Sequence, residues 1–162
     1  MTSDGSASAT SSSTSTTADQ TTTVPTSSSP TTPIDEVDTG DVEGFDVSRI
    51  RIGDEDLVVA LADEPAERAR GLMEVFDLGE LDGMLFSWGG SQVTTGFYMK
   101  NTLIPLTIAF YADDGSYVDS FEMEPCSTEE CPTYRASGSF AYAIEFPAVR
   151  DVSAGDRLFL QP

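Results

Sequence analysis

The sequence predicts a mainly-β domain with one short α-helix, built as a compact β-sandwich or small barrel and preceded by a disordered tail. Many short apolar segments alternate with turns rich in Gly and Asp, and only one segment carries helix signals. The N-terminal segment, in contrast, is mostly Ser and Thr. A chain of 162 residues has room for one ordinary domain and a tail. We therefore place a tail and linker at residues 1–45 and a single β-rich domain at residues 46–162.

The tail has almost nothing apolar to bury. Residues 2–33 are mostly Ser and Thr, with scattered Ala, Asp, Gln and Pro. Such a segment cannot offset an ordering cost of about 1–2 kcal/mol per residue, so we expect it to be disordered. Ser/Thr runs that contain Pro are typical of O-glycosylated surface stalks, and a plain flexible linker is the alternative. Residues 34–46 form an acidic linker that leads into the domain.

The domain begins with a predicted β-hairpin. Residues 47–52 alternate apolar and polar side chains, which is the period of a half-buried strand. Gly53 and Asp54 form the turn, and residues 57–62 return as a more buried strand. A second hairpin turn is predicted at Asp113-Asp114-Gly115. The other predicted strands cover residues 84–88, 94–99, 105–111, 117–123, 140–146 and 157–160.

One helix of about two turns is predicted directly after the first hairpin. Asp63 or Glu64 caps it, and Pro65 lies in the first turn, where its missing N–H is harmless. Arg68 is expected to pair with Glu64 at the i, i+4 spacing. Gly71 lies where the helix should end.

The net charge of the chain disfavours some classes of binding partner. There are 28 Asp and Glu residues against 8 Lys and Arg, a net charge of −20. Such a surface repels phosphate backbones and anionic membranes, so we expect no nucleic-acid partner. The acidity is either an ordinary solvated surface or an adaptation to molar salt, where the Debye length is about 3 Å. We favour the second, a composition like that of acidic haloarchaeal proteins, because Lys100 is the only lysine.

The chain contains no His. This excludes triads in which a histidine activates Ser or Cys, and zinc sites that need imidazole. Met73, Met84, Met99 and Met123 could hold a soft metal such as Cu(I), but scattered methionines more often fill core gaps. We therefore assign no metal, no cofactor and no catalytic residue.

An ordered set of motifs resembles the family known as domain of unknown function 192 (DUF192). The motifs are RARGLM at residues 68–73, GMLF at 83–86, FYMKNTLIPL at 97–106, DDG at 113–115, YAIE at 142–145 and GDRL at 155–158, with Pro125-Cys126 and Cys131-Pro132. The resemblance covers about residues 48–160, the whole domain. It implies a compact, mostly β domain that is often exported and has no established activity. One departure is Tyr98, where the family commonly has Trp.

The candidate site is centred on residues 99–102. The candidate ligand-binding residues are Trp88, Tyr98, Met99, Lys100, Asn101, Thr102 and Glu145. Lys100 and Asn101 follow one strand and precede another that Pro105 opens, a position at a sheet margin. An ammonium group beside an amide can hold an anionic or hydroxyl-rich ligand, with Phe97, Tyr98 and Trp88 as apolar or stacking walls.

Two other roles remain open for the same residues. Lys100 can form an internal ion pair with Glu145 that only stabilises the fold, which is the slightly favoured alternative. The protein can also be an enzyme of unidentified class that uses Lys100, Asn101 and a carboxylate such as Glu145. A lysine nucleophile is disfavoured, because an acidic field opposes the lowered pKa that such a lysine needs. A purely structural surface module is the third possibility.

The two cysteines are predicted to form a disulfide. Cys126 and Cys131 enclose four residues and have Pro on their outer sides. A redox motif would show C-x-x-C beside a βαβ unit, and two thiolates alone make an incomplete metal site. A disulfide that closes a short loop is consistent with an exported protein.

We therefore predict an exported or cell-surface β domain that binds a small molecule, a glycan or a protein through residues 99–102. No run of about 18 apolar residues could span a membrane, and no signal segment is present. We expect a signal or lipid anchor to precede Met1 in the full protein, so that the domain is secreted or tethered to the cell surface. We expect a monomer, and we favour binding over catalysis.

Overall fold

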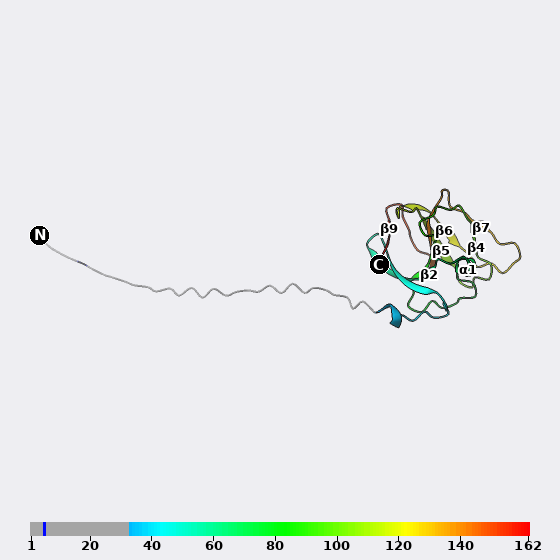
Figure 1. Cartoon of the computed structure of the whole chain (residues 1–162), viewed down its shortest axis with the longest axis horizontal. Coiled ribbons are helices and arrows are strands. Elements are labelled where there is room, and N and C mark those ends of the chain that lie inside the picture. Colours follow the sequence, from blue (N-terminus) through cyan, green and yellow to red (C-terminus); the bar gives the residue numbers. More distant parts are fainter. Residues whose placement is uncertain (1–4, 6–32) are drawn as a thin grey trace. The chain divides into compact units, whose positions relative to one another are not determined.

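The structure is a computed structural model, and it describes Gly5 and residues 33–162 (Figure 1). In this part of the chain there are nine β-strands, one α-helix and one short 3-10 helix, η1 (Ile34–Glu36). The predicted mainly-β class with one short helix is confirmed. The tail predicted for residues 1–45 lies mostly outside the described residues. Neither described helix is long and apolar enough to cross a membrane.

Seven strands form one curled sheet that resembles half of a barrel (Figure 1). They are β1 (Asp46–Ile52), β2 (Glu55–Ala62), β3 (Gly83–Ser87), β5 (Leu106–Tyr111), β6 (Tyr117–Met123), β8 (Tyr142–Pro147) and β9 (Leu158–Leu160). Their order across the sheet is β6-β5-β8-β3-β2-β1-β9. The other two strands, β4 (Phe97–Tyr98) and β7 (Thr133–Tyr134), pair as a separate two-stranded sheet. Of the two architectures expected, the curled sheet is nearer to the small barrel.

The strands β2 and β3 are parallel, whereas the other neighbours in the large sheet are antiparallel. A parallel pair needs a crossover connection, and the predicted helix, α1 (Pro65–Arg70), lies in it. Glu64 caps α1, and a capping box joins it to Glu67. The predicted Arg68–Glu64 ion pair is wrong. The Arg68 guanidinium instead donates to two backbone carbonyls, those of Asp63 and Ser87.

Both predicted hairpins are present. Strands β1 and β2 pair up to Ile52 and Glu55 around a turn in which Gly53 has a positive φ of 58°. Strands β5 and β6 are joined at the predicted DDG turn, where Gly115 has a φ of 81°. A Cβ atom on Gly115 would lie 2.1 Å from the Leu158 carbonyl oxygen, so this position requires glycine.

The segment predicted as an acidic linker packs on the domain instead. Val42 is 2% exposed and belongs to the core. The Asp41 N–H donates to the Asp77 carbonyl at 2.7 Å, and the Asp41 carboxylate accepts from the N–H groups of Phe76 and Asp77. The ordered body therefore begins before residue 46, because one apolar side chain and a few backbone hydrogen bonds dock this acidic segment.

Two apolar cores lie on opposite faces of the large sheet, because side chains alternate along each strand. Strands β3, β5 and β8 give Met84, Phe86, Ile108, Phe110 and Ala143 to the first core, and Leu85, Ala109, Tyr111, Ile144 and Phe146 to the second. By this alternation Glu145 of β8 points into the first core, opposite Met84 and Ile108. A carboxyl group thus occupies an apolar position in the middle of the sheet.

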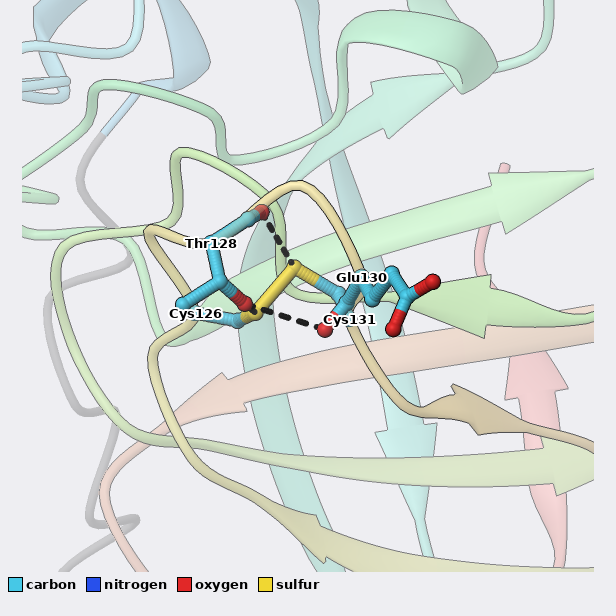
Figure 2. Close-up of a disulfide and its surroundings, with 4 residues drawn as sticks. All are labelled: Cys126, Thr128, Glu130 and Cys131. Carbon is cyan, nitrogen blue, oxygen red and sulfur yellow. Dashed lines mark hydrogen bonds between the residues drawn. A yellow bond between two sulfur atoms is a disulfide. The ribbon is translucent and has the colours of Figure 1, made fainter.

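Cys126 and Cys131 form the predicted disulfide, with their Cα atoms 5.9 Å apart (Figure 2). Inside the loop the Thr128 hydroxyl donates to the Glu130 carbonyl at 3.0 Å. The Cys126 N–H donates to the Met99 carbonyl at 3.2 Å. The disulfide loop is therefore attached to the segment that the sequence places at the centre of the site.

Removal of the disulfide is expected to lower the free energy of unfolding by about 2 kcal/mol, because the bond closes a short loop in the unfolded chain. Urea denaturation of the wild type with and without a thiol reductant measures this loss. The control is the double variant Cys126→Ser, Cys131→Ser, whose midpoint should not respond to the reductant. A wild-type midpoint that stays the same after complete reduction would contradict the prediction.

Candidate binding pocket

A pocket of about 390 Å³ lies between α1, β4 and the face of the sheet that carries the first core. Figure 1 shows α1 and β4 on the same side of the body. The lining residues are Pro65, Arg68, Ala69, Arg70, Gly71, Leu72, Met73, Phe86, Trp88, Thr95, Gly96, Phe97, Tyr98, Thr102 and Glu145. A pocket of this size suits a small molecule.

Glu145 is the buried ionisable group of this pocket. The residue is 5% exposed, and its side chain has no hydrogen bond or ion pair with any of the described residues. Burial raises the pKa of Glu145 from its ordinary value of 4.5 to about 8, because an ionised carboxylate loses its hydration there. At neutral pH this group is therefore mostly a neutral carboxyl, which can both donate and accept a hydrogen bond.

Aromatic rings form the wall next to Glu145. Phe97 makes edge contacts with Phe86, Trp88 and Phe110 at centroid distances of 5.1, 6.3 and 5.6 Å. Phe140 packs beneath them, 4.7 Å from Phe110 and 5.4 Å from Trp88. Such a network of edge-to-face contacts fixes the rings, so the wall is preformed rather than assembled on binding.

Two arginines stand on the α1 side of the pocket. The guanidinium of Arg68 is 5.5 Å from the centre of the Trp88 ring, and that of Arg70 is 4.6 Å from the Phe45 ring. Within the described residues neither arginine has a carboxylate at ion-pair distance, although Arg51, Arg150 and Arg157 each do. Arg68 and Arg70 thus form no ion pair with acidic side chains of the described chain.

Gly71 explains how α1 comes close to the sheet. This residue ends the helix with a φ of 49°. A Cβ atom there would lie 3.3 Å from the Phe86 ring and 4.0 Å from Oε2 of Glu145. The glycine that the sequence marks as a helix stop therefore also leaves space above the buried carboxyl.

The model of the family DUF192, described as an uncharacterized ACR, matches residues 48–159. The chain belongs to this family. Among curated proteins there is no match. A solved structure described as a "putative transcription regulator" from Sinorhizobium meliloti 1021 is similar, with 30% identity and a TM-score of 0.61, covering 75% of this chain and 98% of the other. Another, of unknown function from Novosphingobium aromaticivorans DSM 12444, has 24% identity and a TM-score of 0.64, covering 75% and 91%.

Of the candidate residues chosen in this DUF192 domain, four line the pocket. They are Trp88, Tyr98, Thr102 and Glu145. Met99 is 1% exposed and belongs to the first core, whereas Lys100 and Asn101 are exposed and do not line the pocket. The ion pair between Lys100 and Glu145 considered from the sequence is not formed, since Lys100 points outward while Glu145 lies buried.

The Lys-Asn turn positions part of the pocket without contributing its own side chains. Asn101 has a positive φ of 58°, and its backbone bonds to two loops. Its carbonyl accepts from the Glu74 N–H at 2.8 Å, and its N–H donates to the Cys126 carbonyl at 3.1 Å. Next to it, Thr102 forms a bridge with Met73 and is 6% exposed. The motif therefore works as a turn that places Thr102 at the pocket.

Sequence reasoning missed Arg68 and Phe86 as site residues, whereas Phe97 was expected as a wall of the site and lines the pocket. Arg68 was assigned to a helix ion pair, and Phe86 lies in a predicted buried strand. The available signal was an arginine on a helix that crosses between parallel strands. Among the described residues, no group of three or more His, Cys, Asp or Glu is placed to hold a metal ion. Met84, Met99 and Met123 lie in the first core.

Proposed function

We propose that this domain binds a small molecule in the pocket between α1, β4 and the large sheet. The observation that carries the proposal is Glu145, a buried carboxyl without a partner among the described residues that lines an open pocket. A largely buried carboxyl that faces a pocket and has no hydrogen-bond partner among the described residues is unusual, and it marks a place for a ligand. Trp88, Phe97 and Tyr98 supply the apolar contacts that such a site needs.

A glycan or an extended protein partner fits less well. An extended glycan exceeds a pocket of about 390 Å³, so only a small sugar would fit inside it. A protein partner needs a broad surface, and the key carboxyl lies at the inner end of a small pocket. We therefore place the small molecule first.

Catalysis is the second candidate. A carboxyl with a pKa near 8 is suited to act as a general acid or base at neutral pH. The enzyme hypothesis built on Lys100 and Asn101 loses support, since neither side chain lines the pocket with Glu145. No second carboxylate of the described residues lines the pocket with Glu145, so binding remains the favoured function.

We also propose that the protein is exported and works in concentrated salt. The disulfide supports an oxidising environment outside the cytoplasm. The net charge of −20 with a single lysine supports a haloarchaeal type of protein that acts as a monomer on or outside the cell. The same charge argues against a nucleic-acid partner, so the description of the Sinorhizobium protein is not carried over to this chain.

A change that fills the pocket should abolish binding. Ala69 is exposed on α1 and lines the pocket, whereas Ala66 is exposed on the same helix and does not. Ala69→Phe is expected to weaken ligand binding at least about tenfold by occupying the pocket, and Ala66→Phe to leave it unchanged. Because Trp88 is the only tryptophan and lines the pocket, its fluorescence reports binding directly.

An amide NMR screen in molar salt would identify the ligand class. The compounds are sugars, small carboxylates, amines, amino acids and nucleotides. Shifts that cluster on Phe97, Thr102 and Glu145, and that Ala69→Phe removes, are the expected result. A panel without any shift at these residues, or binding that Ala69→Phe leaves intact, would rule out this pocket as the site.

A further inference from the structure

The pocket holds a cationic group and an acidic group that do not pair with each other. Arg68 lines it from α1 and Glu145 lines it from β8. They form no ion pair, and neither has a charged partner elsewhere in the described part of the chain. An arginine and a glutamate in one pocket normally neutralise each other when they can meet. Here each group lacks a partner of opposite charge in the described part of the chain, so a ligand could supply one.

Arg68 is held in place but keeps donors free. The carbonyls of Asp63 and Ser87 both accept from the same nitrogen, Nη1. A guanidinium has five N–H donors, so the Nη2 and Nε groups remain for a ligand. The Trp88 ring below supports the guanidinium plane. This arrangement suits a carboxylate, which guanidinium binds with two parallel hydrogen bonds.

Glu145 is the group of the pocket that could bind a cationic part of a ligand. The carboxyl lies in the first core beside Phe86, and the position where a Cβ of Gly71 would stand is within 4.0 Å of both groups. An ammonium group that enters this space would meet a carboxylate and the faces of aromatic rings together. The ammonium would replace the lost hydration of the carboxylate, so the buried group could ionise.

We infer that the pocket takes a small zwitterion of the amino-acid type, with its carboxylate on Arg68 and its ammonium on Glu145; this inference rests on the binding function proposed above. A simple anion would satisfy only Arg68 and would be repelled by the acidic protein. A simple amine would satisfy only Glu145 and would be repelled by Arg68 and Arg70, which line the same pocket. A zwitterion satisfies both groups and carries no net charge.

The test compares amino acids with the same molecules lacking one charge. Leucine is compared with 3-methylbutylamine and 4-methylpentanoate, and phenylalanine with 2-phenylethylamine and 3-phenylpropanoate. Titrations follow the fluorescence of Trp88 in the full chain in molar salt at pH 7. At least one amino acid is expected to bind at least about tenfold more tightly than either of its one-charge counterparts, because each charge-assisted hydrogen bond is separately favourable.

Proton release gives a second, independent measurement. The charged groups lining the pocket are Arg68, Arg70 and Glu145, and Tyr98 is the other titratable one. About nine in ten Glu145 carboxyls are protonated at pH 7, given a pKa of about 8. Binding of an ammonium should therefore release nearly one proton per site, measured by calorimetry in buffers of different ionisation enthalpy. Binding of a carboxylate to Arg68 alone should release none.

Variants separate the two ends of the ligand. Glu145→Gln should lower the affinity for the amino acid to that for its deaminated counterpart and abolish proton release. Arg68→Gln should lower the affinity for the amino acid to that for the amine and keep proton release. If Arg68→Gln fails to fold, Arg68→Met, which keeps an unbranched side chain without the charge, replaces it. The control is Arg135→Gln, since Arg135 is exposed and does not line the pocket, and it should bind normally.

The outcomes distinguish this inference from the proposed function. If the one-charge compounds bind as tightly as the amino acids, or if no proton is released, the zwitterion is wrong and small-molecule binding stands. If no amino acid binds while another class from the NMR screen does, the same conclusion follows. If no compound binds in either the NMR screen or the fluorescence titrations, both proposals fail.

Discussion

Glu145→Gln is expected to make the protein more stable at pH 9 by about 4–5 kcal/mol, while leaving its stability near pH 4 almost unchanged. The folded state holds the Glu145 proton up to a pKa of about 8, whereas the unfolded chain releases it near 4.5. Between these values the unfolded chain binds fewer protons, so the stability of the wild type falls as pH rises. Above about pH 8 the loss is complete.

Denaturant unfolding of both proteins from pH 4 to 9 at constant salt measures this difference. Taking the difference between the two curves removes the titration of the many other acids, which both proteins share. Glu122→Gln is the control, because Glu122 is exposed on β6 and should give a flat difference. Parallel curves for Glu145→Gln and wild type would show that Glu145 has an ordinary pKa in the folded protein.

Phe140→Ala is expected to lower the free energy of unfolding by about 3–5 kcal/mol. Phe140 is 0% exposed and packs against the rings of Trp88, Phe97 and Phe110. Its removal leaves a cavity under the pocket wall and frees the rings that stand above it. Ligand affinity should therefore fall together with stability, even though Phe140 does not line the pocket.

The matched control is Phe76→Ala, the same substitution at a residue that is 72% exposed. Its effect on stability should stay within about 0.5 kcal/mol. Urea denaturation with Trp88 fluorescence measures both variants, and the Phe140 variant should also shift the emission of the folded protein. Equal losses for the two variants would mean that the aromatic cluster contributes little to the fold.

Part of the site could be predicted from the sequence. Trp88, Tyr98, Thr102 and Glu145 were selected and line one pocket. The first three lie next to predicted strand ends, whereas Glu145 was selected as a carboxylate partner for Lys100, a contact that is not formed. Lys100 was selected as the only lysine, but its rarity says nothing about the direction of its side chain. The turn at Asn101 points Lys100 outward, and the backbone bonds to Glu74 and Cys126 decide that.

By itself the sequence determined the mainly-β class, both hairpins, the single helix and the disulfide. These features depend on neighbours in the chain: side-chain alternation, Gly and Asp in turns, a capped helix start and two closely spaced cysteines. The tertiary structure alone decided the order of the sheet, the docking of Val42 and the placement of Arg68 and Glu145 in the lining of one pocket. These depend on contacts between residues tens of positions apart, which local periodicity does not encode. The pKa of Glu145 belongs to the same group, because burial sets it and the fold sets burial.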